Sequence, residues 1–355
     1  MIVYINGRFL SQRLTGVQRF AREITKAIDE QWEQWRGIDF RLVVPDDYDK
    51  SFRLDHIKID VLPGKGGYYW EQIRLPRFIK KAKAAYLVSL CNVAPLRLKR
   101  KNIVCIHDLA VVYHPETYSK AFVLVYRFLY KRQTKKSALI LTVTGFSKKQ
   151  IEERYSVPAG KIQIVNNAVS ESFGLDKTMD VSQEVSAILE KPFFFSVGSA
   201  SPNKNMKYVY ACAKANPDVL FAISGDKNKV FSQVEQVSPL PNVVYLGYVN
   251  DRELRLLYSH CQGFIFPSFY EGFGIPPIEA IACGCDTIIA SDIPVLREVL
   301  GRFDINYIDP HDYEHPIDLQ RPLVKNANKS LGYRWRDQAA VLIDRISFLG
   351  EDNNG

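Results

Sequence analysis

Residues 270–284 read Tyr-Glu-Gly-Phe-Gly-Ile-Pro-Pro-Ile-Glu-Ala-Ile-Ala-Cys-Gly, and they follow a short apolar run, Gly-Phe-Ile-Phe-Pro-Ser, at 263–268. The apolar run predicts a buried strand, and the glycines and prolines predict a turn that leads into a helix at 277–283. Proline is tolerated at a helix start, where free backbone amides favour an anion. This order of elements therefore predicts an anion site, with Glu271 on the turn and Glu279 in the helix.

Two interpretations of these glutamates stay open at this point. Carboxylates are suited to accept hydrogen bonds from pairs of sugar hydroxyls. Alternatively, Glu279 complements the helix dipole, which contributes about 0.3–1 kcal/mol, and Glu271 is a solvated loop residue.

The whole run closely resembles the E-x7-E signature of retaining glycosyltransferases of family 4, which have the GT-B fold. The resemblance implies that Glu271 contacts the donor sugar and that Glu279 holds the ribose of a nucleotide-sugar. It also implies that the backbone amides of Gly272, Phe273 and Gly274 meet the diphosphate.

Composition limits the possible classes of protein. The chain has 355 residues, of which 46% are hydrophobic, so it can form two domains with full cores. It has no run of 18 apolar residues, and the apolar start turns polar at Asn6, too early for a signal peptide. We therefore expect a cytoplasmic protein. The six cysteines show neither a disulfide framework nor zinc-site spacing, and we expect no metal and no cofactor.

The charge is distributed unevenly along the chain. Residues 1–175 hold 30 Lys and Arg against 16 Asp and Glu, and the remainder holds 17 against 23. The basic segments lie at 74–83, 97–101 and 130–136, the first with Phe78 and Ile79 among its cations. They fit docking on an anionic membrane surface, where each cation adds about 1 kcal/mol. Solvated helix faces are the alternative, and no nucleic-acid motif accompanies the charge.

Short β-rich runs alternate with longer helical patterns throughout the chain. The strands expected first are 2–5, 40–44, 85–89, 102–106, 139–143 and 162–165, with helices at 17–30 and 122–135. After a polar stretch at 174–190 we expect strands at 193–197, 220–223, 243–246, 263–266 and 287–290, with helices at 206–215, 251–259 and 277–283.

This alternation predicts an α/β fold with parallel sheets. With the resemblance, it implies two Rossmann-like domains that face a cleft: an N-terminal acceptor-binding domain at 1–175 and a C-terminal nucleotide-sugar-binding domain at 190–330. A last helix at 331–350 is expected to pack back on the first domain.

Lys204 lies in a second strand-to-helix turn, Val197-Gly-Ser-Ala-Ser-Pro-Asn-Lys-Asn-Met206. A charge-assisted hydrogen bond from its ammonium group to a phosphate contributes about 1.5–3 kcal/mol. The turn resembles the family's P-x-K-N turn, whose lysine binds the diphosphate. Many members carry a second basic residue at the positions of Ser199 or Asn203, and this chain does not.

His107 and Asp108 follow the strand at 102–106, at the end where open α/β sheets bind ligands. A histidine here is equally a structural residue with satisfied hydrogen bonds. The resemblance to the family's His-Asp-Leu motif implies that His107 approaches the donor sugar and that Asp108 lies on the acceptor side or is structural.

Two further loops resemble family segments. Gly16, after a possible helix cap at Thr15, belongs to a loop that covers the donor phosphates, and Arg19 could bind an acceptor diphosphate or lie on a helix surface. Tyr248 and Val249 match a loop that receives the nucleotide base through backbone groups, which hides the identity of the base.

The resemblance implies a retaining, metal-independent glycosyltransferase at the inner face of the cytoplasmic membrane. It would move a hexose to a lipid-linked glycan acceptor in O-antigen, capsule or other surface-polysaccharide assembly, with Glu271, His107 and Lys204 as catalytic residues. Residues 6–8 and 15–19 resemble mannosyltransferase-like members, so GDP-mannose is the first donor to consider. A nucleotide-sugar epimerase of GT-B architecture and a non-catalytic sugar- or lipid-binding protein are the alternatives.

Overall fold

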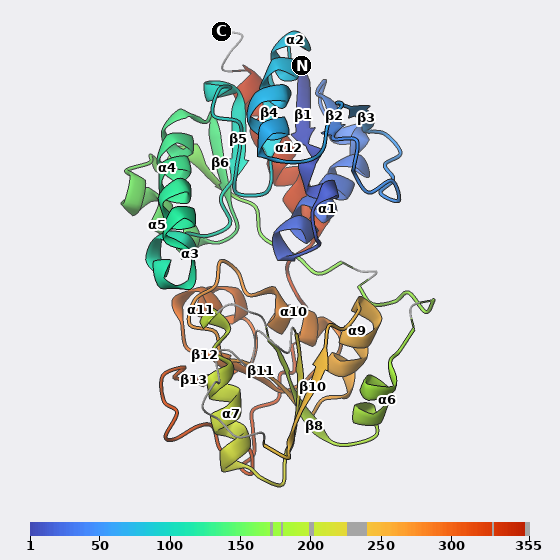
Figure 1. Cartoon of the computed structure of the whole chain (residues 1–355), viewed down its shortest axis with the longest axis vertical. Coiled ribbons are helices and arrows are strands. Elements are labelled where there is room, and N and C mark those ends of the chain that lie inside the picture. The colour runs from blue at the N-terminus through green and yellow to red at the C-terminus, as the bar shows by residue number, and fades with distance from the viewer. Residues whose placement is uncertain (171–172, 179, 199–201, 226–239, 329, 352–355) are drawn as a thin grey trace. The chain divides into compact units, whose positions relative to one another are not determined.

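The computed structural model describes residues 1–170, 173–178, 180–198, 202–225, 240–328 and 330–351. The chain divides into two compact units. Unit 1 comprises Met1–Asn167 together with Tyr333–Gly355, and unit 2 comprises Ala168–Gly332. Each unit is built on one parallel sheet (Figure 1), so the predicted α/β class with two parallel-sheet domains is confirmed.

Unit 1 has a seven-stranded parallel sheet in the order β3-β2-β1-β4-β5-β6-β7. Its strands are β1 (Ile2–Asn6), β2 (Asp39–Val44), β3 (Lys58–Val61), β4 (Tyr86–Ser89), β5 (Asn102–Cys105), β6 (Leu139–Thr142) and β7 (Ile162–Ile164). The sequence predicted all of them except β3. This edge strand has no buried residue, so its apolar signal is weak.

Helices cover both faces of this sheet (Figure 1). They are α1 (Gly16–Asp29), the π-helix η3 (Trp70–Arg74), α2 (Leu75–Lys81), α3 (Ala110–Tyr113), α4 (Lys120–Lys136), α5 (Gly145–Tyr155) and α12 (Trp335–Glu351). Short 3-10 turns lie at η1 (Gly7–Ser11), η2 (Trp32–Gln34), η4 (Lys99–Lys101), η5 (Pro115–Thr117) and η6 (Ala159–Lys161). No helix in the described part of the chain is long and apolar enough to cross a membrane.

Strand register decides which helices share a face of the sheet. Tyr4 pairs with Leu87, and Leu87 pairs with Asn102 on the next strand. Side chains two residues apart on a strand share a face, so Val104 points to the same side as Tyr4 and Leu87. This is the face that α2, α4 and α5 cover. On the other face α12 packs against α1, with the rings of Phe20 and Trp335 centred 5.6 Å apart.

The proposed docking role of Ile79 is wrong. Ile79 is fully buried in a core cluster with Leu75 and Trp70, and the ring of Phe78 packs edge-on against Tyr4 at 5.3 Å. Ile79 therefore cannot insert into a membrane, and Phe78 is partly covered by the sheet.

Unit 2 has a six-stranded parallel sheet in the order β10-β9-β8-β11-β12-β13. Its strands are β8 (Phe193–Val197), β9 (Leu220–Ser224), β10 (Val243–Gly247), β11 (Gly263–Phe266), β12 (Ile288–Ser291) and β13 (Asn306–Ile308). Its helices are α6 (Gln183–Leu189), the 3-10 turn η7 (Pro202–Lys204), α7 (Met206–Ala215), α9 (Asp251–His260), α10 (Ile275–Ala282) and α11 (Pro294–Leu300). The sequence did not predict the three-residue strand β13.

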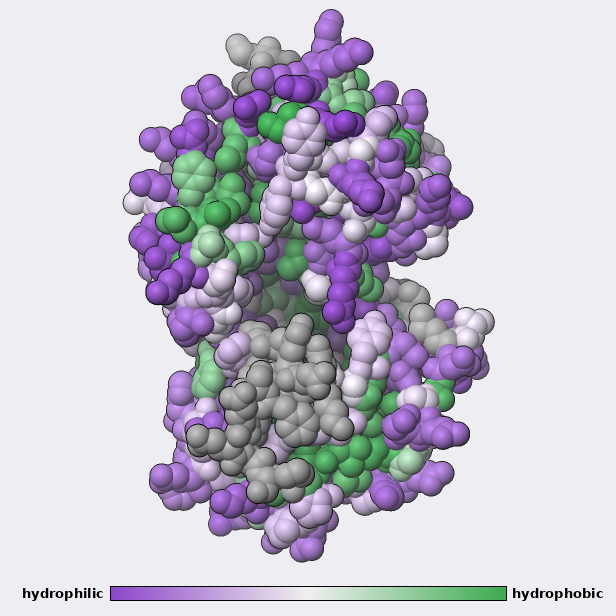
Figure 2. Space-filling view, in the orientation of Figure 1, coloured by the Kyte–Doolittle hydropathy of each residue, from purple (hydrophilic) through white to green (hydrophobic). Residues whose placement is uncertain are grey.

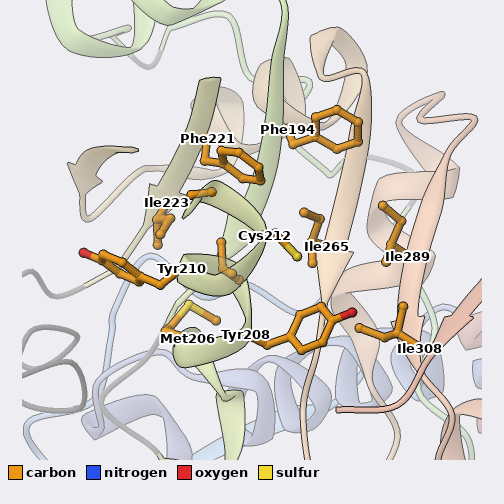
Figure 3. Close-up of a cluster of buried hydrophobic side chains, with 12 residues drawn as sticks. Phe194, Met206, Tyr208, Tyr210, Cys212, Phe221, Ile223, Ile265, Ile289 and Ile308 are labelled. Carbon is orange, nitrogen blue, oxygen red and sulfur yellow. The ribbon is translucent and has the colours of Figure 1, made fainter. Parts of the chain in front are cut away.

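The core of unit 2 fixes helix α7 to the sheet (Figure 3). Met206 and Tyr208 begin the helix, and their side chains meet Ile223, Ile265 and other buried side chains of the strands. The core packing therefore fixes the first turn of α7 to the sheet.

Both sheets contain a point at which the strand order reverses. Consecutive connections leave β8 and β11 in opposite directions in unit 2, and they leave β1 and β4 in opposite directions in unit 1. In open α/β sheets, ligands bind outside the carboxyl ends of the strands at this position. The topology therefore predicts a ligand site in each unit, in the crevice between the carboxyl ends of β8 and β11 in unit 2 and of β1 and β4 in unit 1.

Candidate active site

Lys204 and Glu271 form an ion pair at the reversal point of unit 2. Lys204 ends the loop after β8, and Glu271 lies on the loop after β11. Lys204 Nζ lies 2.7 Å from Glu271 Oε1 and 4.7 Å from the ring centroid of Phe266. The two side chains are 22% and 14% exposed, so both are largely shielded yet reachable by a ligand.

Asn205 holds the loops of this crevice together. Its Nδ2 donates hydrogen bonds to the carbonyl oxygens of Pro267 at 3.0 Å and Pro310 at 2.8 Å, and its Oδ1 accepts one from the hydroxyl of Tyr313. The residue is buried and has φ of +50°, a conformation that asparagine tolerates better than most residues. Asn205 thus ties the loop that carries Lys204 to the loops after β11 and β13.

The turn before α10 has the conformation that the glycines predict. Gly274 has φ of +82°, and a Cβ atom there would lie 2.6 Å from the side chain of Leu296. Pro276 and Pro277 occupy the first turn and have no amide hydrogen, so the donors at this helix mouth come from the residues just before them. Gly272 and Phe273 lie just before this helix start, and both residues are buried.

Glu279 lies inside α10 and is buried, with 8% of its surface exposed. Its Oε2 accepts a hydrogen bond from the hydroxyl of Tyr258 at 3.3 Å. Burial and the neighbouring Glu279 raise the pKa of Tyr258 well above its ordinary value, so the phenol stays protonated as the donor. The carboxylate is therefore held in one direction by α9.

Three glycines bring the loops after β8, β9 and β10 into contact. The amide of Gly198 donates to Ser224, and that of Gly225 donates to Gly247, each at 2.7 Å. A Cβ on Gly225 would lie 2.4 Å from the carbonyl oxygen of Gly198, so only glycine allows this approach.

Tyr248 and Val249, the residues expected at the nucleotide base, come directly after Gly247 in the sequence. Tyr248 is 79% exposed and Val249 is half-buried. Of the two positions where the resemblance leads one to expect a second basic residue, Asn203 is buried, and Ser199 lies outside the described residues.

In unit 1, His107 is buried with both its backbone and its ring engaged. Its amide donates to Asn92 Oδ1 at 2.9 Å, and its Nε2 lies 2.8 Å from the carbonyl oxygen of Leu90. The ring meets that of Phe20 edge-on at 4.8 Å. Burial lowers the pKa of His107 to about 4, against a smaller opposing effect of the Leu90 carbonyl, so the imidazole is neutral near pH 7.

The other predicted residues of unit 1 lie in two segments. Gly16 begins α1 with open space where a Cβ would stand, and Arg19 lies one turn further. Thr15 occupies the N-cap position, but its hydroxyl bonds to the side chain of Gln18 instead of capping the helix. Asp108 Oδ1 accepts a hydrogen bond from the amide of Ala110 at 2.8 Å, which shapes the turn after β5.

A buried ion pair that the sequence did not single out lies at the reversal point of unit 1. Glu71, on the π-helix η3, is 3% exposed and accepts hydrogen bonds from Arg8 at 2.7 Å and Asn6 at 2.9 Å. Asn6 also reaches Ser89 Oγ at 3.4 Å, which joins the carboxyl ends of β1 and β4. Burial raises the pKa of Glu71, and Arg8 opposes this effect. A π-helical turn and a buried carboxylate often mark functional sites.

The structure brings together Lys204, Glu271 and the turn at 272–274 in the crevice of unit 2. It places His107, Asp108, Gly16 and Arg19 in unit 1. Glu279 lies behind the turn, against α9.

The sequence matches two family models, Glycosyltransferase Family 4 over residues 14–173 and Glycosyl transferases group 1 over residues 179–333. The O-antigen chain mannosyltransferase RfbU of Salmonella typhimurium is 30% identical over 69% of this chain, and the match spans 65% of that protein, slightly under two thirds. The O-antigen chain mannosyltransferase B of Escherichia coli is 29% identical over 85% of this chain and 84% of its own length.

Among solved structures, HepE of Anabaena in complex with UDP-glucose aligns with a TM-score of 0.63 and 15% identity, covering 100% of this chain and 99% of that one. This likeness concerns the fold. Together, the two family models cover residues 14–173 and 179–333, nearly the whole chain. This chain belongs to the family 4 glycosyltransferases.

Proposed function

We propose that the protein transfers a hexose from a nucleotide-sugar to a lipid-linked glycan acceptor in surface-polysaccharide assembly, with retention of configuration and without a metal. The observation that carries this proposal is the Lys204–Glu271 pair at the reversal point of unit 2. The names of the two O-antigen chain mannosyltransferases support mannose, and hence GDP-mannose, as the first donor to test. The UDP-glucose in HepE supports a nucleotide-sugar in general.

In this proposal Lys204 and the turn amides stabilise the departing diphosphate. Charge develops on the leaving oxygen as the glycosidic bond breaks, and fixed donors lower the energy of that state without rearranging. Lys204 is held by a carboxylate, a ring face and the following Asn205, so its ammonium group is oriented before the donor arrives.

Glu271 has one oxygen available for the sugar. Its Oε1 bonds to Lys204, and the described residues offer no partner to its Oε2. A carboxylate oxygen accepts hydrogen bonds from sugar hydroxyls, so Oε2 can orient the hexose while Oε1 keeps Lys204 in place.

The remaining assignments extend the same proposal. Glu279 holds the ribose, and Tyr248 and Val249 flank the base. In unit 1, His107 approaches the donor sugar as a neutral hydrogen-bonding group, since its pKa is lowered to about 4. Gly16 covers the donor phosphates, whereas Arg19 and Asp108 serve the acceptor at the inner face of the cytoplasmic membrane; their support is the family membership.

The test is nucleotide release from a panel of GDP- and UDP-sugars, with and without a polyprenyl-diphosphate-linked glycan and with and without a chelator. We expect one donor to give acceptor-dependent release that a chelator leaves unchanged, and NMR of the product to show the anomeric configuration of the donor. Glu271→Ala should abolish transfer and leave binding of the free nucleotide largely intact. The absence of binding and turnover with every donor would overturn the proposal.

A further inference from the structure

Helix α4 exposes large apolar side chains to solvent. Leu124 is 72% exposed, Phe128 54% and Val125 52%. Figure 2 shows hydrophobic residues gathered on the face of unit 1 where Figure 1 places α4, with hydrophilic residues around them. Isolated apolar residues are common on protein surfaces, but a contiguous exposed group on one helix marks a contact site.

The same helical stripe changes from apolar to cationic along its length. Leu124, Phe128, Lys131 and Lys135 follow one another at intervals of four, three and four residues, so they lie on one side of α4. The first two turns of this side are apolar, and the last two are basic.

The basic end of the stripe opens into a pocket of about 660 Å³ between α4 and the chain that leaves α5. Its cations are Arg127, Lys131, Lys135, Arg154 and Lys161. No Asp or Glu lines it, and none of these cations has a carboxylate partner among residues 1–170 and the other described segments.

The walls of the pocket are ordered by the fold. Lys161 Nζ donates to the carbonyl oxygens of Thr134 at 2.9 Å and Lys135 at 3.1 Å, at the end of α4. Positive charges also repel one another at the end of α4 beside the pocket. The pKa of Lys136 is lowered there, chiefly by Arg132. A ligand with several negative charges relieves this repulsion.

We propose that this surface docks the protein on an anionic bilayer, with the phosphate of an anionic phospholipid in the pocket and Leu124, Val125 and Phe128 inserted at the interface. An amphipathic helix binds such a membrane through buried apolar area and attraction of its cations to acidic lipids. Leu124 and Val125, the two most hydrophobic positions beside Phe128, are aliphatic and exposed, which suits insertion among acyl chains better than stacking on nucleic-acid bases. The inference rests on the proposed function in one respect, since a lipid-linked acceptor requires the enzyme at a bilayer.

The first experiment is flotation with vesicles of phosphatidylcholine, alone or mixed with phosphatidylglycerol. The wild type should float only with the mixed vesicles. Lys131→Glu/Lys135→Glu should weaken that binding by roughly 30-fold or more, because each cation contributes about 1 kcal/mol. The matched control is Arg77→Glu/Lys80→Glu, which makes the same charge change on two exposed residues of α2 and should bind like the wild type.

The second variant tests insertion. Leu124→Asn/Phe128→Asn should also lose binding to mixed vesicles, with an unchanged melting temperature because both side chains are exposed. Binding of either α4 variant at the wild-type level would overturn the proposal. Equal loss in the α2 control would overturn it too, because the attraction would then be a diffuse effect of net charge.

Two further measurements separate this inference from the proposed function. Nucleotide release without vesicles should be unchanged in the α4 variants. If the proposed function is wrong, the wild type itself releases no nucleotide; if the docking surface is wrong, release is normal and the α4 variants still bind vesicles. Titration with inorganic pyrophosphate and with RNA shows whether the pocket serves another anion. Tight binding of either, without vesicle binding, would replace the bilayer as the partner.

Discussion

Substitution of Lys204 and of Glu271, the two members of the ion pair, should affect nucleotide affinity and sugar transfer differently. Lys204→Met removes a charge-assisted hydrogen bond to the diphosphate, which contributes about 1.5–3 kcal/mol. Since each 1.4 kcal/mol is a factor of ten, affinity for GDP or UDP should fall about 10- to 100-fold. Glu271→Gln keeps the side-chain shape but releases Lys204 from its 2.7 Å contact, so nucleotide affinity should be equal or higher. Transfer should nevertheless fall about 10- to 100-fold, because the charged acceptor for the sugar is lost.

Calorimetric titration with GDP and UDP measures the first effect, and nucleotide release by the same preparations measures the second. Asp318→Asn is the control, because it removes one charge from an exposed pair with Arg321 in the same unit, 2.9 Å long. We expect it to change neither quantity. If Glu271→Gln weakened nucleotide binding as much as Lys204→Met, Glu271 would be part of the diphosphate site and its assignment to the sugar would be refuted.

Three further substitutions test the scaffold. Asn205→Ala should lower the free energy of unfolding by about 2–3 kcal/mol in urea, because it leaves two carbonyl oxygens and one hydroxyl without their partner. Glu71→Gln should lower it by about 3 kcal/mol, since the largely shielded Arg8 then lacks its counter-charge, and Arg8→Met/Glu71→Met should restore part of the loss. Protonation of His107 is disfavoured in the folded state, so its contribution is complete above pH 6.5 and is lost as the pH falls toward 4. His107→Gln should therefore flatten the urea stability profile in that window by about 3 kcal/mol.

Much of the donor side could be predicted from the sequence because its parts are continuous. The turn at 270–284 and the turn that ends at Lys204 each follow an apolar run, and both runs became central strands of unit 2. Their meeting follows from the reversal of strand order in the sheet of unit 2, which the local sequence pattern does not predict. Asn205 was quoted within its motif, but its three hydrogen bonds join loops that are distant in sequence.

In unit 1 the sequence did not single out Glu71, and it suggested a wrong surface role for Ile79. Glu71 contacts Arg8 and Asn6 only because the topology brings η3 beside the end of β1, and a single glutamate in a mixed segment gives no sign of burial. Ile79 was taken for a surface residue because cations flank it. Leu75 and Ile79 are four residues apart, a spacing that already placed them on one helix face.

The position of α12 has a consequence for the order in which the protein is made. Unit 2 is one continuous segment, whereas unit 1 takes α12 from the far side of it. During synthesis, unit 2 can close as soon as its own residues emerge. The apolar side of α1 around Phe20 must wait until Trp335 has left the ribosome, so unit 1 begins first and is completed last.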